Sequence, residues 1–253
     1  MDLQAAADAL GVHYQTAYGW VRSGRLPARK VGHGYQISDS DVTALADQRS
    51  RGTQPTSQIR VRDWPVQAGQ VYLAIADGDE IGARKLIGRL AGHVSVTDLC
   101  DKVLGPALRR IGADWAAGKV SIAQEHRATA ICERLLATHA PRPAGRPRGT
   151  AIVSTPPGER HGMPALMAAA CLREDHWQMQ HLSADLPAAE IGTMARQIGA
   201  TLVVLSTAST GGALRADRAA RVIRRVTPGA VLLTGHSGDT LSALRARARQ
   251  VAG

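Results

Sequence analysis

Two short segments of the chain carry side chains whose chemistry suits a metal or a bound ligand. Glu159 and His161 lie in the run PPGERHGMP, directly after the apolar segment AIVST. Imidazole is a common metal ligand, and a carboxylate two residues away can orient the ring through its second nitrogen. The second segment, WAAGKVSIAQEH, contains Trp115, Glu125 and His126. Singly these residues are ordinary, so their meaning depends on the elements that position them.

Glu125 and His126 are predicted to lie in the first turn of a helix. Ser121 and Gln124 form a capping-box pattern, which marks a helix start. The helix dipole favours a carboxylate in that turn, and a histidine there is exposed and free to bind a ligand. Trp115 ends the preceding helix, one short turn away. On this segment alone, a core tryptophan and an ordinary charged helix start remain the simpler interpretation.

The C-terminal part of the chain, residues 150–253, is predicted to form a Rossmann-like, doubly wound parallel sheet. Four short apolar runs alternate there with helical segments, the pattern of strands covered by helices on both faces. Such sheets bind ligands at the carboxyl ends of their strands. His161 follows the first strand, and Ser206 and Gly235 lie in small or glycine-rich loops after the third and the fourth. These residues are therefore expected along one edge of the sheet.

Helical periodicity in residues 66–140 occurs in four bursts, which predicts a four-helix bundle. Polar segments that contain Pro, Gly and Arg flank it at residues 46–65 and 141–149, and these are predicted to be linkers. The fold class is therefore multidomain, α and α/β.

Residues 1–45 are predicted to form a winged helix-turn-helix, because two apolar stripes at helical spacing precede a short hairpin around Gly32 and Gly34. This domain is predicted to bind double-stranded operator DNA. The run resembles the excisionase-like and MerR-like families. The second helix offers side chains to base edges and phosphates, namely Tyr14, Gln15, Thr16 and Tyr18. The cations expected on the phosphate backbone are Arg22, Arg25, Arg29 and Lys30. The alternative is a small structural domain with a few surface cations.

Charge and cysteine content limit the other possibilities. The chain has 253 residues and a net charge of +10, yet residues 1–45 hold equal numbers of acidic and basic side chains. Residues 211–253 carry eight arginines against Asp217 and Asp239, which we interpret as a solvated helix face. Three separated cysteines are expected to be buried thiols. No apolar run is long enough for a membrane span, so a cytoplasmic protein without a membrane partner is expected.

The spacing of the two ligand-binding segments resembles the cobalamin pocket of the CarH-type light-responsive repressors. The resemblance implies adenosylcobalamin, with methylcobalamin as the alternative, between a helical cap and the sheet domain. His161 would be the lower cobalt ligand, supported by Glu159. Ser206 and Gly235 would line the slot for the nucleotide tail. The resemblance implies that three residues lie over the upper face of the corrin ring: Trp115, Glu125 and His126. Arg160 and Asp185 would form an ion pair between protomers of a dimer or tetramer.

The sequence departs from this family pattern at three positions. Pro164 and Thr234 replace glycines of the loop motifs, and Ala116 replaces a histidine that takes cobalt after light exposure. Two alternatives therefore stay open beside the light-responsive regulator. One is a light-independent cobalamin sensor, or a regulator with a degenerate pocket. The other, a corrinoid-carrying methyltransferase subunit, fits less well with a DNA-reading head, so the chain is not expected to be an enzyme.

Overall fold

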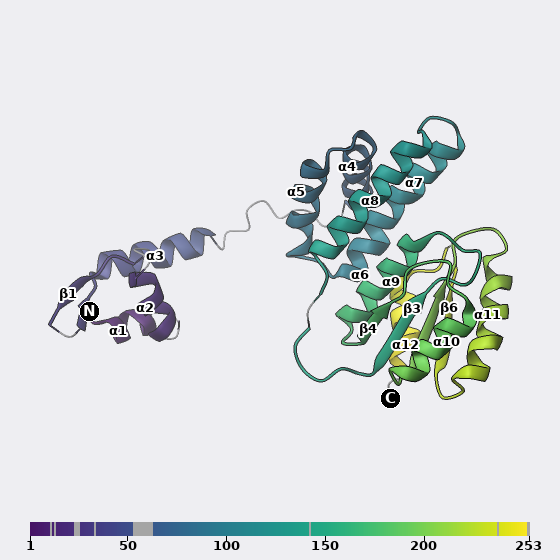
Figure 1. Cartoon of the computed structure of the whole chain (residues 1–253). Coiled ribbons are helices and arrows are strands. Elements are labelled where there is room, and N and C mark those ends of the chain that lie inside the picture. Colours follow the sequence, from purple (N-terminus) through teal and green to yellow (C-terminus); the bar gives the residue numbers. More distant parts are fainter. Residues whose placement is uncertain are drawn as a thin grey trace. The chain divides into compact units, whose positions relative to one another are not determined.

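The computed structural model describes the chain except residues 11, 13, 23–25, 33, 53–62, 142, 237 and 252–253. Contacts divide it into two compact units, Met1–Val61 and Arg62–Gly253. Figure 1 shows the elements of both units. Each unit is described by itself.

The N-terminal unit contains three helices and a hairpin. Its helices are α1 (Leu3–Ala9), α2 (Tyr14–Arg22) and α3 (Asp39–Gly52). Strands β1 (Arg29–Val31) and β2 (Gly34–Gln36) pair antiparallel, with Gly32 at a φ of 58° in the turn. A core that includes Leu3, Leu26 and Ile37 holds these elements together. Helix α3 continues to Gly52, into the segment predicted as a linker.

The second unit begins with a helical segment. Its helices are α4 (Trp64–Asp77), α5 (Glu80–Ala91), α6 (Val96–Leu99), α7 (Gly105–Ala116) and α8 (Ile122–Thr138). Between α6 and α7 lies η1 (Cys100–Leu104), a π-helical turn that makes α6, η1 and α7 one continuous run. The three cysteines are buried and unpaired, as predicted.

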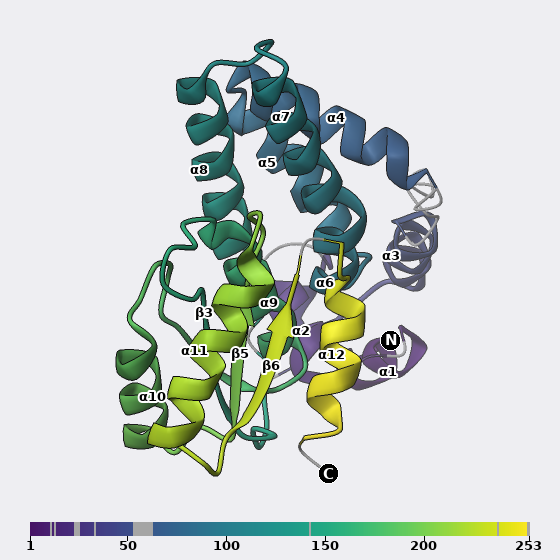
Figure 2. The same cartoon turned by 90° about the vertical axis from the view of Figure 1, so that its right-hand side faces the viewer.

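The rest of the second unit is a parallel α/β sheet, as the sequence predicts. Its strands are β3 (Thr150–Ser154), β4 (Gln178–His181), β5 (Leu202–Ser206) and β6 (Val231–Gly235), in the order β4-β3-β5-β6. The helices are α9 (Gly162–Glu174), α10 (Ala188–Gln197), α11 (Gly212–Val226) and α12 (Leu241–Arg249). Helices α9 and α12 cover one face, and α10 and α11 cover the other (Figure 2).

The strand order places a topological switch point between β3 and β5. The chain leaves β3, returns as β4 on one side, and then returns as β5 on the other side. The loops after β3 and β5 therefore diverge, and the opening between them is where open α/β sheets bind ligands.

The helical segment is joined to the sheet domain by two reciprocal helix caps. The carboxylate of Glu174, at the end of α9, accepts hydrogen bonds from the backbone N–H groups of Val96 (2.6 Å) and Thr97 (3.2 Å), which begin α6. The carboxylate of Asp101, in η1, accepts from the N–H groups of Leu241 (2.8 Å) and Ser242 (3.0 Å), which begin α12. Each domain thus satisfies free N–H groups of the other's helix, which fixes the α6 end of the helical segment on α9 and α12.

Replacing Glu174 with alanine is expected to destabilise the second unit by about 2 kcal/mol, because the N–H groups of Val96 and Thr97 at the start of α6 lose their acceptor. Urea unfolding followed by circular dichroism measures this change. Glu133→Ala, at an exposed position on α8, is the matched control and should change the free energy of unfolding by less than about 0.5 kcal/mol. Equal stabilities of the two variants would show that this cap contributes little.

Candidate functional site: the sheet edge at β3 and β5

His161 lies at the start of α9, and its ring is held by Glu159. The Nδ1 atom of His161 lies 2.5 Å from Oε1 of Glu159, and the same oxygen accepts the His161 backbone N–H at 3.1 Å. The Glu159 side chain is fully buried, whereas the His161 side chain is 63% exposed. The sequence prediction that Glu159 could orient this ring is therefore matched by a direct contact.

The second oxygen of Glu159 ties the β3 loop to the β5 loop. Oε2 accepts the backbone N–H groups of Ala208 (3.0 Å) and Ser209 (2.9 Å) and the Ser209 hydroxyl (2.5 Å). Arg215 in turn donates to the Ser209 hydroxyl. Glu159 thus spans the switch point. Sequence reasoning missed Ala208 and Ser209, although the small polar run TAST directly after β5 marks their loop.

These contacts keep Glu159 ionised. Burial raises the pKa of the carboxyl group, but the hydrogen bonds from Ser209 and His161 outweigh it and lower the pKa to about 2. An ionised carboxylate only accepts hydrogen bonds, so Nδ1 of His161 donates to it. The neutral ring then carries its lone pair on Nε2, the nitrogen free to coordinate a metal.

A second set of contacts holds the β3 loop in shape. The Thr155 hydroxyl donates to the Glu159 carbonyl (2.5 Å) and accepts from the Asp185 N–H (2.8 Å). Asp185 accepts from the N–H of Gly158 (2.7 Å), a glycine with a φ of 80°. Arg160 and Asp185, predicted to pair between protomers, form an ion pair of 3.7 Å within one chain, and the Arg160 side chain is 88% exposed. The pairing between protomers stays a prediction.

Pro164 occupies the first turn of α9 rather than the loop. The first N–H groups of a helix have no intrahelical partner, so a proline there removes no helix hydrogen bond. The helix begins at Gly162 and is regular, so the replacement of glycine by proline is accommodated.

Ser206 and Gly235 are neighbours across the sheet, paired in register at the ends of β5 and β6. Ser206 is buried. A Cβ atom added to Gly235 would meet no atom within 4 Å, so there is open space beside this backbone. The hydroxyl of Thr207 donates to the Gly235 carbonyl (3.2 Å) and lies 3.0 Å from Nδ1 of His236. The two residues predicted beside the nucleotide tail therefore lie at the same edge of the sheet as the β3 loop.

The three predicted cap residues lie at the turn between α7 and α8. The capping box of Ser121 and Gln124 is present as predicted. Glu125 Oε2 lies 2.8 Å from Nδ1 of His126, and the His126 side chain is 72% exposed. Trp115 is 49% exposed, so it is not the core anchor of the simpler interpretation.

The structure does not join these cap residues to the sheet-domain residues. In both views the α7–α8 turn lies at the end of the helical segment opposite α6 and α9 (Figures 1 and 2). Across residues 63–141 and 143–236, no hydrogen bond or ion pair links Trp115, Glu125 or His126 to Glu159 or His161. The sheet side and the helical side are two separate groups of residues.

The predicted DNA-contacting residues lie on α2 and the hairpin. Tyr14, Gln15 and Thr16 are exposed, and Tyr18 is half-buried. Tyr18 contacts the Tyr35 ring edge-on, with centroids 6.0 Å apart, so it also connects α2 to β2. Exposed cations are present at Arg22, Arg29 and Lys30, whereas Arg25 lies outside the described residues.

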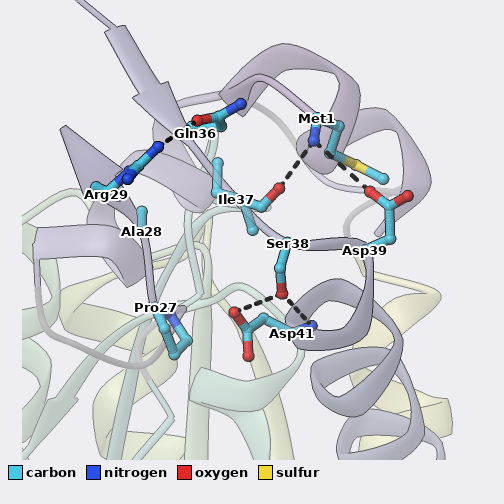
Figure 3. Close-up of a pocket in the computed structure, with 9 residues that line it drawn as sticks. All are labelled: Met1, Pro27, Ala28, Arg29, Gln36, Ile37, Ser38, Asp39 and Asp41. Atoms are coloured by element: carbon cyan, nitrogen blue, oxygen red, sulfur yellow. Dashed lines mark hydrogen bonds and ion pairs between the residues drawn. The ribbon is translucent and has the colours of Figure 1, made fainter. Parts of the chain in front are cut away.

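Figure 3 shows a pocket between the hairpin and the start of α3. Arg29 donates there to the side chain of Gln36 (3.3 Å), and the Ser38 hydroxyl donates to Asp41 (2.7 Å). The polar groups of this pocket pair with one another, so we assign it no ligand.

Comparisons with known families define the class of the protein. Residues 1–50 match the helix-turn-helix domain, and residues 68–138 match the B12 binding domain. The chain therefore joins these two domains, as the sequence predicts. None of the helices in the described part of the chain has the length and apolarity needed to cross a membrane.

The chain is similar to the HTH-type transcriptional repressor CarH of Myxococcus xanthus. The two are 24% identical over 245 aligned residues, which cover 83% of this chain and 80% of the relative. The resemblance to the CarH-type repressors is thus confirmed. The fold is also similar to that of the Methanosarcina barkeri monomethylamine corrinoid protein, with a TM-score of 0.56 and 16% identity over 72% of this chain and 96% of that one.

Proposed function

We propose that this protein is a DNA-binding transcriptional regulator, acting as a repressor, that binds adenosylcobalamin between its helical segment and its sheet domain. The observation that supports this most directly is His161. Its Nδ1 is held by a buried, ionised carboxylate, and its ring projects from the sheet edge at the switch point.

The residues at the sheet edge fit a corrinoid. A neutral imidazole with a free Nε2 is a suitable cobalt ligand, and Glu159 keeps the ring in that tautomer. The open space beside Gly235 allows a nucleotide tail to approach the backbone. His161 would thus hold the metal from the sheet side, with Ser206 and Gly235 beside the tail.

Light is the proposed signal. When bound, adenosylcobalamin supplies a cobalt–carbon bond that light breaks. Trp115, Glu125 and His126 would contact the adenosyl group, so its loss removes contacts that favour one arrangement of the helical segment. A ligand shifts such an equilibrium only through different affinities for the two arrangements. The proposed result is the loss of a dimer or tetramer and, because paired heads bind DNA more tightly than single ones, release of the operator.

The test is to soak the purified chain with adenosylcobalamin in the dark, remove free ligand by desalting, and record the absorption spectrum. A retained red chromophore that changes spectrum and elution volume under green light supports the proposal. A colourless protein after soaking with adenosyl-, methyl- and hydroxocobalamin contradicts cobalamin binding altogether.

Ala116 favours a second candidate, a light-independent cobalamin sensor. Alanine cannot ligate cobalt, so the second histidine that the resemblance implies at this position is missing. The same experiment separates the two, because a sensor retains the chromophore without any change of elution volume under light.

Trp115→Ala is expected to abolish the difference in affinity between adenosyl- and hydroxocobalamin. The side chain is half-exposed, so losing the buried half of the ring should lower the free energy of unfolding by about 1 to 3 kcal/mol, and the titrations compare folded proteins. Titrations of both cobalamin forms measure the effect, with Leu73→Ala, an exposed position on α4, as the control. If the mutant and the parent show the same difference in affinity between the two cobalamin forms, Trp115 does not contact the adenosyl group.

A further inference from the structure

The eight arginines of residues 211–253 fall into two groups of different character. Four have partners: Arg215 with Thr210 (3.1 Å), Arg245 with Glu174 (3.2 Å), Arg247 with Thr234 (3.0 Å) and Arg249 with Asp175 (2.6 Å). The other four all lie on α11 and are exposed: Arg218, Arg221, Arg224 and Arg225. Within the described residues, none of these four makes an ion pair or a side-chain hydrogen bond.

Three of the four unpartnered arginines form a row along one face of α11. Arg218, Arg221 and Arg225 are spaced three and four residues apart, so their side chains project to the same side. The row spans about 10 Å along the helix axis, since each residue rises about 1.5 Å. We call Arg218, Arg221 and Arg225 the α11 row. Asp217 is the only acidic residue of the helix.

The α11 row faces away from the contacts that assemble the second unit. Helix α11 packs on α10 and the sheet, whereas α9 and α12 on the opposite face contact the helical segment (Figure 2). Gly192 of α10 lies against Val226 at the end of α11, so α10 and α11 pack closely there. Nothing within the second unit, as far as it is described, covers the row.

The distribution of charge indicates what the row binds. The helix-turn-helix domain carries four basic and four acidic side chains within residues 1–45, so the net charge of +10 lies outside it. Binding to duplex DNA depends largely on cations that neutralise phosphates. Guanidinium groups match phosphate oxygens with two parallel donors, and the row contains arginine and no lysine.

We propose that the α11 row is a second DNA-contacting surface, which binds the phosphate backbone of duplex DNA while the helix-turn-helix reads the bases. This proposal rests on the proposed DNA binding of the chain and adds a contact site to it. The sheet domain, besides holding the ligand, then contributes sequence-independent affinity.

The test is the salt dependence of binding of the full chain to a random-sequence duplex of about 40 base pairs, measured by fluorescence anisotropy between about 50 and 200 mM KCl. The variant is R218Q/R221Q/R225Q. The control, K85Q/R89Q/R109Q, removes three exposed charges from the helical segment and lowers the net charge equally. Each phosphate contact contributes about 0.9 to the slope of log K against log salt, so the α11 variant should lose about 2.7 from that slope. The control should keep the slope of the parent, and both variants should unfold at the parent's temperature.

Three results would overturn the proposal. If the parent does not bind the duplex at all, the proposed DNA binding itself fails. If the parent binds and the α11 variant keeps its slope, or both variants lose it equally, only the α11 row is excluded. If the α11 variant loses binding to polyglutamate but binds the duplex like the parent, the row is a docking site for an acidic protein.

Discussion

Replacing His161 with alanine is expected to lower cobalamin retention by about tenfold to a hundredfold and to change the absorption spectrum of the cobalamin that remains. The reason is that the side chain supplies the proposed lower ligand, with Nδ1 bound to Glu159 and Nε2 available. The free energy of unfolding should fall by about 1 to 2 kcal/mol, because the buried Glu159 carboxylate loses one hydrogen bond, so both proteins stay folded during the titration. Equilibrium titration and absorption spectra in the dark measure both effects.

His93→Ala is the matched control, since it removes an exposed histidine on the helical segment. It should retain cobalamin with the spectrum of the parent. If His161→Ala also does so, His161 is not the axial ligand, and cobalamin, where it is retained, is held by other groups. That result would leave the helix-turn-helix and its DNA binding unaffected.

Replacing Glu159 with glutamine is expected to affect both stability and ligand binding. The carboxylate accepts five hydrogen bonds, two from His161, two from Ser209 and one from Ala208. The amide group of glutamine would face at least one of these donors with its own N–H groups. We expect a loss of about 2 kcal/mol in the free energy of unfolding. Because the tautomer of His161 is no longer enforced, cobalamin affinity should fall about tenfold or more.

The pH dependence of stability gives an independent measure of the same carboxylate. The pKa of Glu159 is about 2 in the folded chain, below the usual glutamate value of 4.5. Its contribution is therefore fully present above about pH 4.5 and is lost as the pH falls towards 2, by about 3 kcal/mol in total. The difference in stability between the parent and Glu159→Gln should shrink over this range, as measured by urea unfolding.

Glu190→Gln, which alters an exposed carboxylate on α10, is the control for the pH series. Its difference from the parent should stay near zero at every pH. A difference between the parent and Glu159→Gln that is constant from pH 6 to about 2.5 would mean that the pKa of Glu159 is not depressed.

Local sequence patterns predicted most of the secondary structure near the site. The capping box of Ser121 and Gln124 begins α8, and the four apolar runs of the C-terminal part form the strands β3 to β6. These features depend on neighbouring residues in the chain. A helix start needs its cap within three residues, and a buried parallel strand needs a short apolar run.

The contacts that complete the site could not be predicted in this way. Ala208 and Ser209 lie about fifty residues from Glu159 in sequence, and they meet it only because the strand order brings the β3 and β5 loops to one switch point. Arg160 and Asp185 lie 25 residues apart in sequence and form an ion pair within one chain, while their pairing between protomers stays a prediction.

The sequence by itself determined the residue types that could bind a corrin ring, the order of the helix-turn-helix, helical and sheet segments, and the neutral charge of residues 1–45. Only the tertiary structure decided which oxygen of Glu159 holds His161, how Glu174 and Asp101 join the two domains, and which arginines stay unpartnered. The physical reason is that hydrogen bonds and ion pairs depend on distances between atoms, and residues far apart in sequence acquire those distances only when the chain packs.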